Sequence, residues 1–141
     1  MNNQLIRSLS CIALGLAMLI TIPGCAVEIL NIKDAPVKTL SGKDLALQQV
    51  TKAVVLAGMG LKWEMDVAEP GHIVGTLNLR GHQAVVDVTY STSTYSITYK
   101  SSRNLIQIDG NGRPFGIHPN YNGWIENLDN AIRTQVIAAG P

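Results

Sequence analysis

Between Leu61 and Tyr99, apolar and polar residues alternate almost without exception. Apolar side chains at every second position are typical of strands with one face in the core and the other in solvent. Short segments of turn-forming residues interrupt the alternation at Pro70-Gly71, at Gly81-His82 and from Ser91 to Thr94. The pattern therefore predicts consecutive strands joined by tight turns, which is an antiparallel meander.

The turns also predict which residues face each other across the strands. A two-residue Gly81-His82 loop with glycine first suits a type II′ hairpin, and the polar segment Ser91 to Thr94 joins the next two strands. Counting outward from these turns predicts the pairs Leu79 with Ala84, Leu77 with Val86, Tyr90 with Tyr95, Val88 with Ile97, and Val86 with Tyr99. A two-residue Pro70-Gly71 loop would pair Val67 with Val74 from the polar face, so we expect an odd-length loop or a bulge there.

A helix is predicted ahead of the strands. Apolar or small residues recur at intervals of three and four from Ala46 to Ala57, which gives one buried stripe. Ser41 can cap the first turn, with Asp44 reaching back in a capping-box arrangement. Gly58 and Gly60 are the expected stop.

The C-terminal part of the chain predicts a short strand, a loop and a second helix. Leu105 to Ile108 is apolar and is expected to form a fifth, edge strand, followed by a loop containing Pro114 and Pro119. The helix carries its apolar residues at helical spacing, at Tyr121, Trp124, Ile125, Leu128, Ile132 and Val136. Asn120 or Asn122 is the expected cap.

Together these elements predict a single α+β domain over residues 41–139. Each element has one apolar face, so a two-layer domain is expected, with both helices on one face of a four- to five-stranded antiparallel meander and the other face polar and open. Ahead of it, residues 25–40 could be a tether, or, because Val27, Ile29 and Leu30 are apolar, an edge strand.

The first 24 residues have the pattern of an export signal that is removed. Arg7 precedes an apolar segment from Leu9 to Ile22, which is shorter than the ~20 residues that a transmembrane helix needs. The segment Ile22-Pro23-Gly24-Cys25 resembles the lipobox of bacterial lipoproteins, although Pro23 departs from the usual pattern. The resemblance implies cleavage before Cys25 and diacylglycerol on its thiol; a plain signal peptide or an uncleaved anchor are the alternatives.

Several segments of the predicted domain carry a second resemblance. They are Pro70-Gly71-His72-Ile73, Arg80-Gly81-His82, Val86 to Tyr90, Tyr95 to Tyr99, Ser102 to Leu105 and Ile117 to Ile125. Together they resemble a group of small, largely uncharacterised proteobacterial lipoproteins, over about Val50 to Ile132. The resemblance implies an envelope domain and adds no catalytic role. In lipoproteins of Gram-negative bacteria, Ala26 after the modified cysteine, instead of Asp, implies the periplasmic face of the outer membrane.

Charge and cysteine content narrow the classes of partner. The chain has 11 Lys and Arg against 10 Asp and Glu. Because Arg7 lies in the leader, the mature chain would be neutral, whereas proteins that track a nucleic-acid backbone need a basic surplus. Of the two cysteines, Cys11 lies in the leader and Cys25 would carry lipid. We therefore expect no nucleic-acid partner and no disulfide.

Side chains with catalytic potential are few and form no recognised motif. His72, His82 and His118 do not have the spacing of metal ligands. A hydrolase triad could combine a serine with His82 or His118 and with Asp87 or Asp109, but no nucleophile-elbow sequence surrounds any serine. We predict no cofactor and no metal. The alternative is a small periplasmic hydrolase or metal-dependent enzyme that uses His82 or His118.

The predicted function is therefore a non-enzymatic binding or structural module of the envelope. It would attach to the membrane through Cys25 and bind an envelope protein or a cell-wall polymer. Its surface would be the polar sheet face, which includes Thr76, Asn78, Asp87, Ser96 and Thr98, or the loop from Arg113 to Asn122 beside Ser102 to Asn104. The candidate partner-binding residues are Asn78, Asp87, Asn104, His118, Asn120 and Tyr121.

Overall fold

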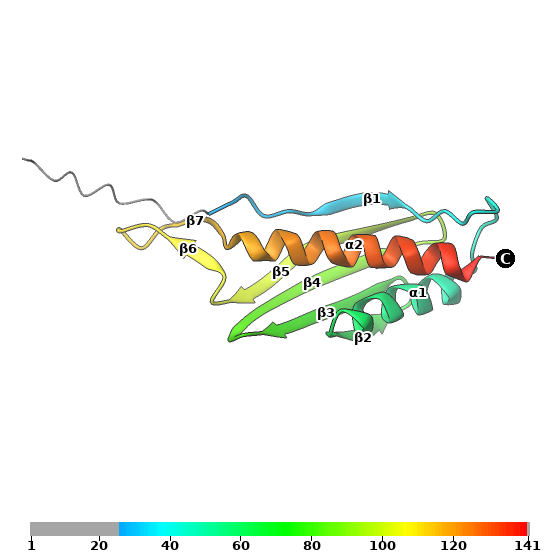
Figure 1. Cartoon of the computed structure of the whole chain (residues 1–141), viewed down its shortest axis with the longest axis horizontal. Helices are drawn as coiled ribbons and strands as arrows, with labels where there is room; N and C mark the ends of the chain where they lie inside the picture. The colour runs from blue at the N-terminus through cyan, green and yellow to red at the C-terminus, as the bar shows by residue number, and fades with distance from the viewer. Residues whose placement is uncertain (1–25, 141) are drawn as a thin grey trace, which may run out of the picture.

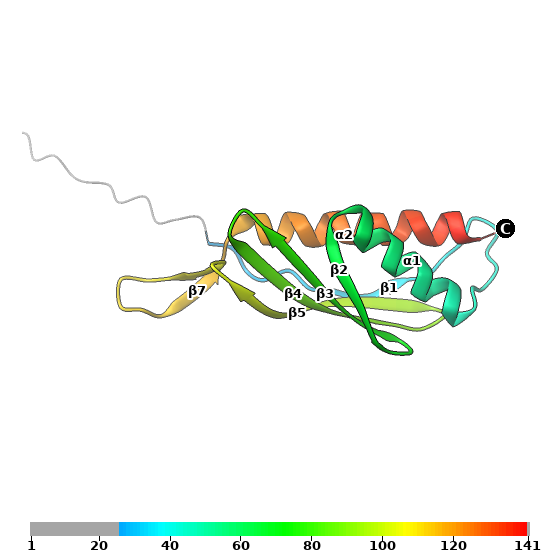
Figure 2. The ribbon, with the colours of Figure 1, turned by 90° about the horizontal axis from the view of Figure 1, so that it is seen from below.

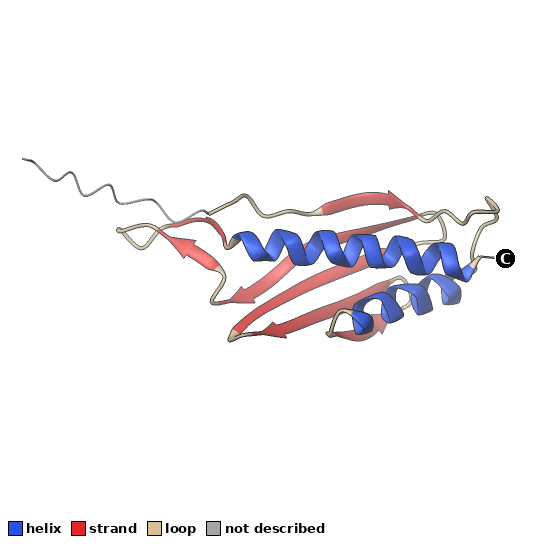
Figure 3. Cartoon of the chain, in the orientation of Figure 1, coloured by secondary structure: helices blue, strands red, loops and turns tan. Residues whose placement is uncertain are grey.

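The computed structural model describes residues 26–140, so the leader and Cys25 lie outside the described residues. The elements follow in the order β1 (Ile32–Pro36), α1 (Leu47–Gly60), β2 (Trp63–Glu69), β3 (His72–Leu79), β4 (His82–Tyr90), β5 (Thr94–Arg103), β6 (Ile106–Ile108), β7 (Pro114–Ile117) and α2 (Pro119–Ala139). The first five strands form one antiparallel sheet in the order β1-β5-β4-β3-β2. Both helices cover the same face of this sheet (Figure 1, Figure 3). The predicted two-layer α+β fold is thus confirmed.

The core lies between the helices and the covered face of the sheet. Both helices and the sheet contribute fully buried side chains to it. These include Val50 and Val54 of α1, Ile73, Val86, Val88 and Ile97 of the sheet, and Ile125, Leu128 and Ile132 of α2. Tyr90 and Tyr95 also point into it, as their position in the alternation predicts. Seen from below, α2 runs along the length of the sheet on this side (Figure 2).

The predicted register is confirmed for two of the three turns. Tyr90 faces Tyr95, Val88 faces Ile97 and Val86 faces Tyr99. The expected bulge at the first turn is also present, because the register between β2 and β3 shifts between Val67 and Glu69. The extra residue lets Pro70-Gly71 form a tight turn while Val67 pairs with Ile73.

The register predicted for the middle turn is wrong by two residues. Leu79 pairs with His82, and Leu77 pairs with Ala84, so the loop consists of Arg80 and Gly81. Both loop residues have positive φ, 50° for Arg80 and 82° for Gly81, as a type I′ turn requires. A shift of two residues preserves the side-chain face, so the apolar side is still the one predicted.

Helix α1 is present and ends at Gly60, where the stop was predicted, but its predicted start is wrong. It begins at Leu47 after Ala46, whose backbone N–H donates to Oε1 of Gln49, and the hydroxyl of Ser41 instead contacts Thr39. Leu45 is buried, so the chain stays extended through Ala46 to place it in the core. At the other end the left-handed residue is Lys62, with φ 67°, rather than a glycine.

The sheet edge beside β5 is formed by β1, near the start of the described residues, and not by Leu105 to Ile108. Of the two alternatives for residues 25–40, the edge strand is the one present over β1, which pairs with β5. The expected strand at Leu105 to Ile108 is present as β6, but the prediction that it joins the main sheet is wrong, because β6 pairs with β7 in a separate two-stranded sheet. Asn104 has a left-handed φ of 59°, which turns the chain out of β5 before this hairpin begins.

Candidate functional site

The face of the sheet turned away from the helices carries the polar positions of β3, β4 and β5. The register places Val74, Asp87 and Thr98 in one row across these strands, and His72, Thr89 and Ser96 in the next. Asp87 belongs to the central strand of the sheet and therefore lies in the middle of this face.

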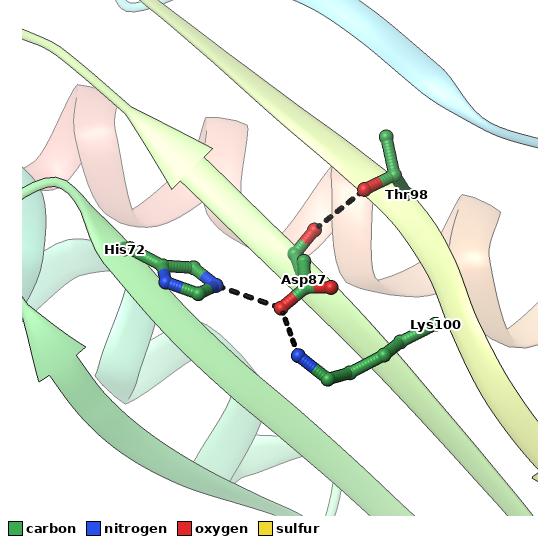
Figure 4. Close-up of polar contacts among 4 residues, drawn as sticks. All are labelled: His72, Asp87, Thr98 and Lys100. Carbon is green, nitrogen blue, oxygen red and sulfur yellow. Dashed lines mark hydrogen bonds and ion pairs between the residues drawn. The ribbon is translucent and has the colours of Figure 1, made fainter.

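Asp87 is the centre of a polar cluster that joins three strands (Figure 4). Its Oδ1 lies 2.7 Å from Nε2 of His72 on β3 and 2.8 Å from Nζ of Lys100 on β5. The hydroxyl of Thr98 donates to the backbone oxygen of Asp87 at 3.4 Å. Both side-chain contacts are made to Oδ1, so within residues 26–140 the second carboxylate oxygen has no hydrogen-bond donor.

Asp87 stays ionised under ordinary conditions. Partial burial opposes its charge, but the hydrogen bonds and positive charges of Lys100 and His72 outweigh it and lower the pKa of Asp87 below its ordinary value of 3.8. The cluster therefore presents an ionised carboxylate already held in place by two donors, with one oxygen able to accept a hydrogen bond from a partner.

A second group of candidates lies where the β3–β4 turn meets the chain after β5. Nδ1 of His82 lies 2.7 Å from the backbone oxygen of Asn104, and the Asn104 amide donates to the backbone oxygen of Gly81 at 2.8 Å. The His82 and His118 rings are 5.8 Å apart between centroids. Sequence spacing does not indicate this proximity, because the two residues lie on separate elements.

His118 caps α2, so the predicted cap at Asn120 or Asn122 is wrong. Its Nδ1 accepts a hydrogen bond from the backbone N–H of Asn120 at 3.2 Å, and Pro119 occupies the first helical position. The side chain of Asn122 instead accepts from the backbone N–H of Leu30 and donates to the backbone oxygen of Glu28. It thereby attaches the first described segment to α2.

The structure does not bring the six candidate partner-binding residues together. Asp87 lies mid-face, Asn78 is exposed and accepts from Gln83, and Asn104 and His118 take part in the contacts just described. Asn120 is exposed in the first turn of α2. Tyr121 is fully buried, with its ring edge-on to Tyr99 at 5.7 Å, and is not at the surface.

The groups proposed for a hydrolase triad do not meet. Asp87 pairs with His72 rather than with His82 or His118. Oδ1 of Asp109 accepts from the backbone N–H groups of Asn111 and Arg113 and so closes the β6–β7 turn. Over residues 26–140, no three His, Cys, Asp or Glu side chains lie close enough to hold a metal ion.

Comparisons of the chain with protein-family models, with curated protein sequences and with solved structures found no match. Within residues 26–140, neither helix combines the length and the hydrophobicity needed to cross a membrane. The Asp87 cluster on the open sheet face is the best-organised candidate site in the described part of the chain.

Proposed function

We propose that the protein is a non-enzymatic lipoprotein of the bacterial envelope that docks another envelope protein on the open face of its sheet. The anchor would be lipid on Cys25, at the periplasmic face of the outer membrane. Two or more acyl chains hold a protein durably at a bilayer, whereas one chain binds only marginally. The support for this anchor is the segment Ile22-Pro23-Gly24-Cys25, together with the short apolar leader before it.

The observation that carries the docking role is the Asp87 cluster on a sheet face that neither helix covers. A carboxylate held by His72 and Lys100 loses little further freedom when a partner binds, which favours affinity. The pairing of opposite charges within the cluster also reduces the desolvation penalty of covering it.

The extent and composition of this face favour a protein partner over a small ligand. Small molecules bind in concave pockets, whereas a specific protein interface covers roughly 800 Å² on each partner. The polar face extends over β3, β4 and β5 and includes partly exposed Val74 and Val85 among its hydroxyls and charges. Such a mixture of apolar and polar groups is typical of non-obligate interfaces.

Mass spectrometry of the mature amino terminus tests the anchor. The expected result is a first residue at Cys25 carrying diacylglycerol, and recovery of the protein in the outer-membrane fraction. The variant Cys25→Ser should remove the lipid and release the protein from that fraction. An unmodified thiol on a chain that keeps its leader would contradict the proposal.

Site-specific photo-crosslinking in cells tests the docking face. A photoreactive residue at Thr89, which is exposed beside Asp87 on β4, should capture a protein; the matched control is Gln48, exposed on α1. Asp87→Asn keeps the side-chain volume and removes the charge, so it should lower the yield several-fold. Equal yields from the two positions would contradict the docking face, and an adduct digested by muramidase instead of protease would assign it to the wall polymer.

A further inference from the structure

The β6–β7 hairpin exposes three large apolar side chains. Ile108 is 63% exposed, Phe115 is 50% exposed and Ile106 is 38% exposed. Figure 1 and Figure 2 both show the hairpin extending past the main sheet at one end of the molecule. Exposed apolar groups gathered at such a tip indicate a surface that binds lipid or protein.

The tip of the hairpin is held in shape by its own hydrogen bonds. The backbone N–H of Asp109 donates to the oxygen of Arg113 at 2.8 Å, and the Asp109 carboxylate accepts from two backbone N–H groups of the turn. Gly112 supplies the positive φ, 78°, that the turn needs. The apolar side chains are therefore presented on a defined scaffold.

The first described residues are fixed directly on this hairpin. Val27 exchanges two backbone hydrogen bonds with Ile117 of β7, at 3.1 and 2.9 Å. A Cβ on Gly116 would lie 2.9 Å from both the Ala26 Cβ and the Val27 oxygen, so the segment passes close over β7. The proposed lipid site, Cys25, is only two residues before Val27 in the sequence.

The charges around the hairpin suit an anionic surface. In segments 26–31, 79–82 and 103–118, the basic residues are Arg80, Arg103 and Arg113, and all three are exposed. Glu28 and Asp109 are the acidic residues there, and Asp109 is engaged in the turn. Arginines near anionic headgroups favour membrane binding.

We propose that the β6–β7 hairpin is a membrane contact, in which Ile108 and Phe115 enter the lipid interface beside the acyl chains of Cys25. This inference rests on the proposed lipid anchor. Because Cys25 precedes Val27 by only two residues in the sequence, lipid on Cys25 would bring a bilayer to the end of the described chain that is paired with β7, so a bilayer is the apolar surface best placed to meet the hairpin. Attachment at two points would orient the molecule so that the C-terminal end of α2, which lies at the opposite end from the hairpin in Figure 1, points away from the bilayer.

The test uses the protein made with its own leader and reconstituted in vesicles of phosphatidylethanolamine and phosphatidylglycerol. Ile108→Cys introduces a thiol for an environment-sensitive fluorophore. The matched control is Leu40→Cys, which is 85% exposed and follows Thr39, the residue that contacts Gly140 at the opposite end. With Cys11 removed and Cys25 acylated, the introduced thiol is the only free one.

The expected result is a blue shift and strong quenching by brominated lipid for the label at Ile108, with neither at Leu40. Quenching of the Ile108 label by aqueous iodide alone would show a hairpin in water and overturn the contact. Quenching by neither agent would show the hairpin covered by protein, such as a second copy, and would also overturn it.

Failure of the anchor gives a different signature. If the chain without an introduced cysteine takes up fluorophore at Cys25 and does not sediment with vesicles, the lipid anchor itself is absent and both proposals fall. Sedimentation with vesicles and no labelling at Cys25, combined with a water-exposed Ile108 label, would remove the hairpin contact alone.

Discussion

The hydroxyl of Tyr95 and the carboxylate of Asp129 meet inside the core, between β5 and α2. The hydroxyl donates to Oδ1 at 2.5 Å, and Nε of Arg133 donates to Oδ2 at 2.9 Å. Burial, together with the neighbouring Asp129, raises the pKa of Tyr95 above its ordinary value of 10.0, so the phenol keeps its proton. Each oxygen of the nearly buried Asp129 carboxylate thus accepts a hydrogen bond.

Replacing Tyr95 by Phe should lower the free energy of unfolding by about 1–3 kcal/mol, because a buried carboxylate oxygen then loses its donor. Tyr90→Phe is the matched control: its hydroxyl contacts the neutral hydroxyl of Thr51 at 2.9 Å, and about 0.5–1.5 kcal/mol is expected. Urea unfolding followed by tryptophan fluorescence measures both values. A larger loss for Tyr90→Phe would contradict this account.

Asp87 should make the free energy of unfolding depend on pH only under acidic conditions. The pKa of Asp87 is lower in the folded protein than its ordinary value of 3.8, which applies to the unfolded chain. Its contribution to stability is therefore present at pH values above the ordinary value, and it is lost as the pH falls through the folded-state pKa. Lys100→Met should raise the pKa of Asp87, because one of its two donors is removed. An NMR titration of the Asp87 carboxyl carbon measures the shift, with Lys52→Met on α1 as control. Equal midpoints in the two variants would show that Lys100 does not stabilise the carboxylate.

At the scale of elements, α1 packs closely on β2 because a glycine, Gly58, lies at the contact. Gly58 is buried, and a Cβ there would lie 2.6 Å from Cγ and 2.9 Å from Cε of Met65. Gly60, two residues later in the same helix, would place its Cβ within 4 Å of nothing. The glycine predicted as a helix stop therefore serves as a close contact between helix and sheet.

These two glycines form a matched pair for mutation. Gly60→Ala should stabilise the protein by up to about 1 kcal/mol through helix propensity. Gly58→Ala gains the same propensity but overpacks against Met65, at about 1–3 kcal/mol, so a net loss is expected. In a Met65→Ala background the difference between the two substitutions should vanish, which thermal unfolding can measure as a coupling energy. A persistent difference would place the strain elsewhere.

The two edge strands of the main sheet carry features that limit pairing with other chains. On β1 these are Pro36, Lys33 and the register shift between Ile32 and Ala35. On β2 they are the acidic Glu64 and Asp66 and the bulge before Glu69. Proline, charges and bulges make strand edges poor templates for aggregation. An interaction by strand addition is accordingly disfavoured, which is consistent with the proposed docking on the open face of the sheet.

At the scale of the whole molecule, the proposed orientation at the membrane depends on how Val27 is attached to β7. Gly116→Ala should push the first segment away and lower the hydrogen-exchange protection of the Val27 and Ile117 amides by about tenfold, or about 1.4 kcal/mol of local stability. Gly110→Ala is the control, since a Cβ there meets nothing within 4 Å. Unchanged protection in Gly116→Ala would show that the attachment is looser than the contacts imply.

Sequence periodicity alone determined the two helices, the four strands of the meander and the face that each buries. It did so because burial repeats every second residue in a strand and every three or four in a helix. It also placed Asp87 on the open face, although not beside Lys100 and His72, whose approach depends on the register of three strands.

Only the tertiary structure decided the register of the Arg80-Gly81 turn, the strand at the sheet edge and the start of each helix. A two-residue shift leaves every side chain on the same face, so alternation cannot detect it. The edge position depends on contacts such as that between Leu30 and Asn122, which are 92 positions apart. Such contacts arise from packing between distant segments, and no local pattern encodes them.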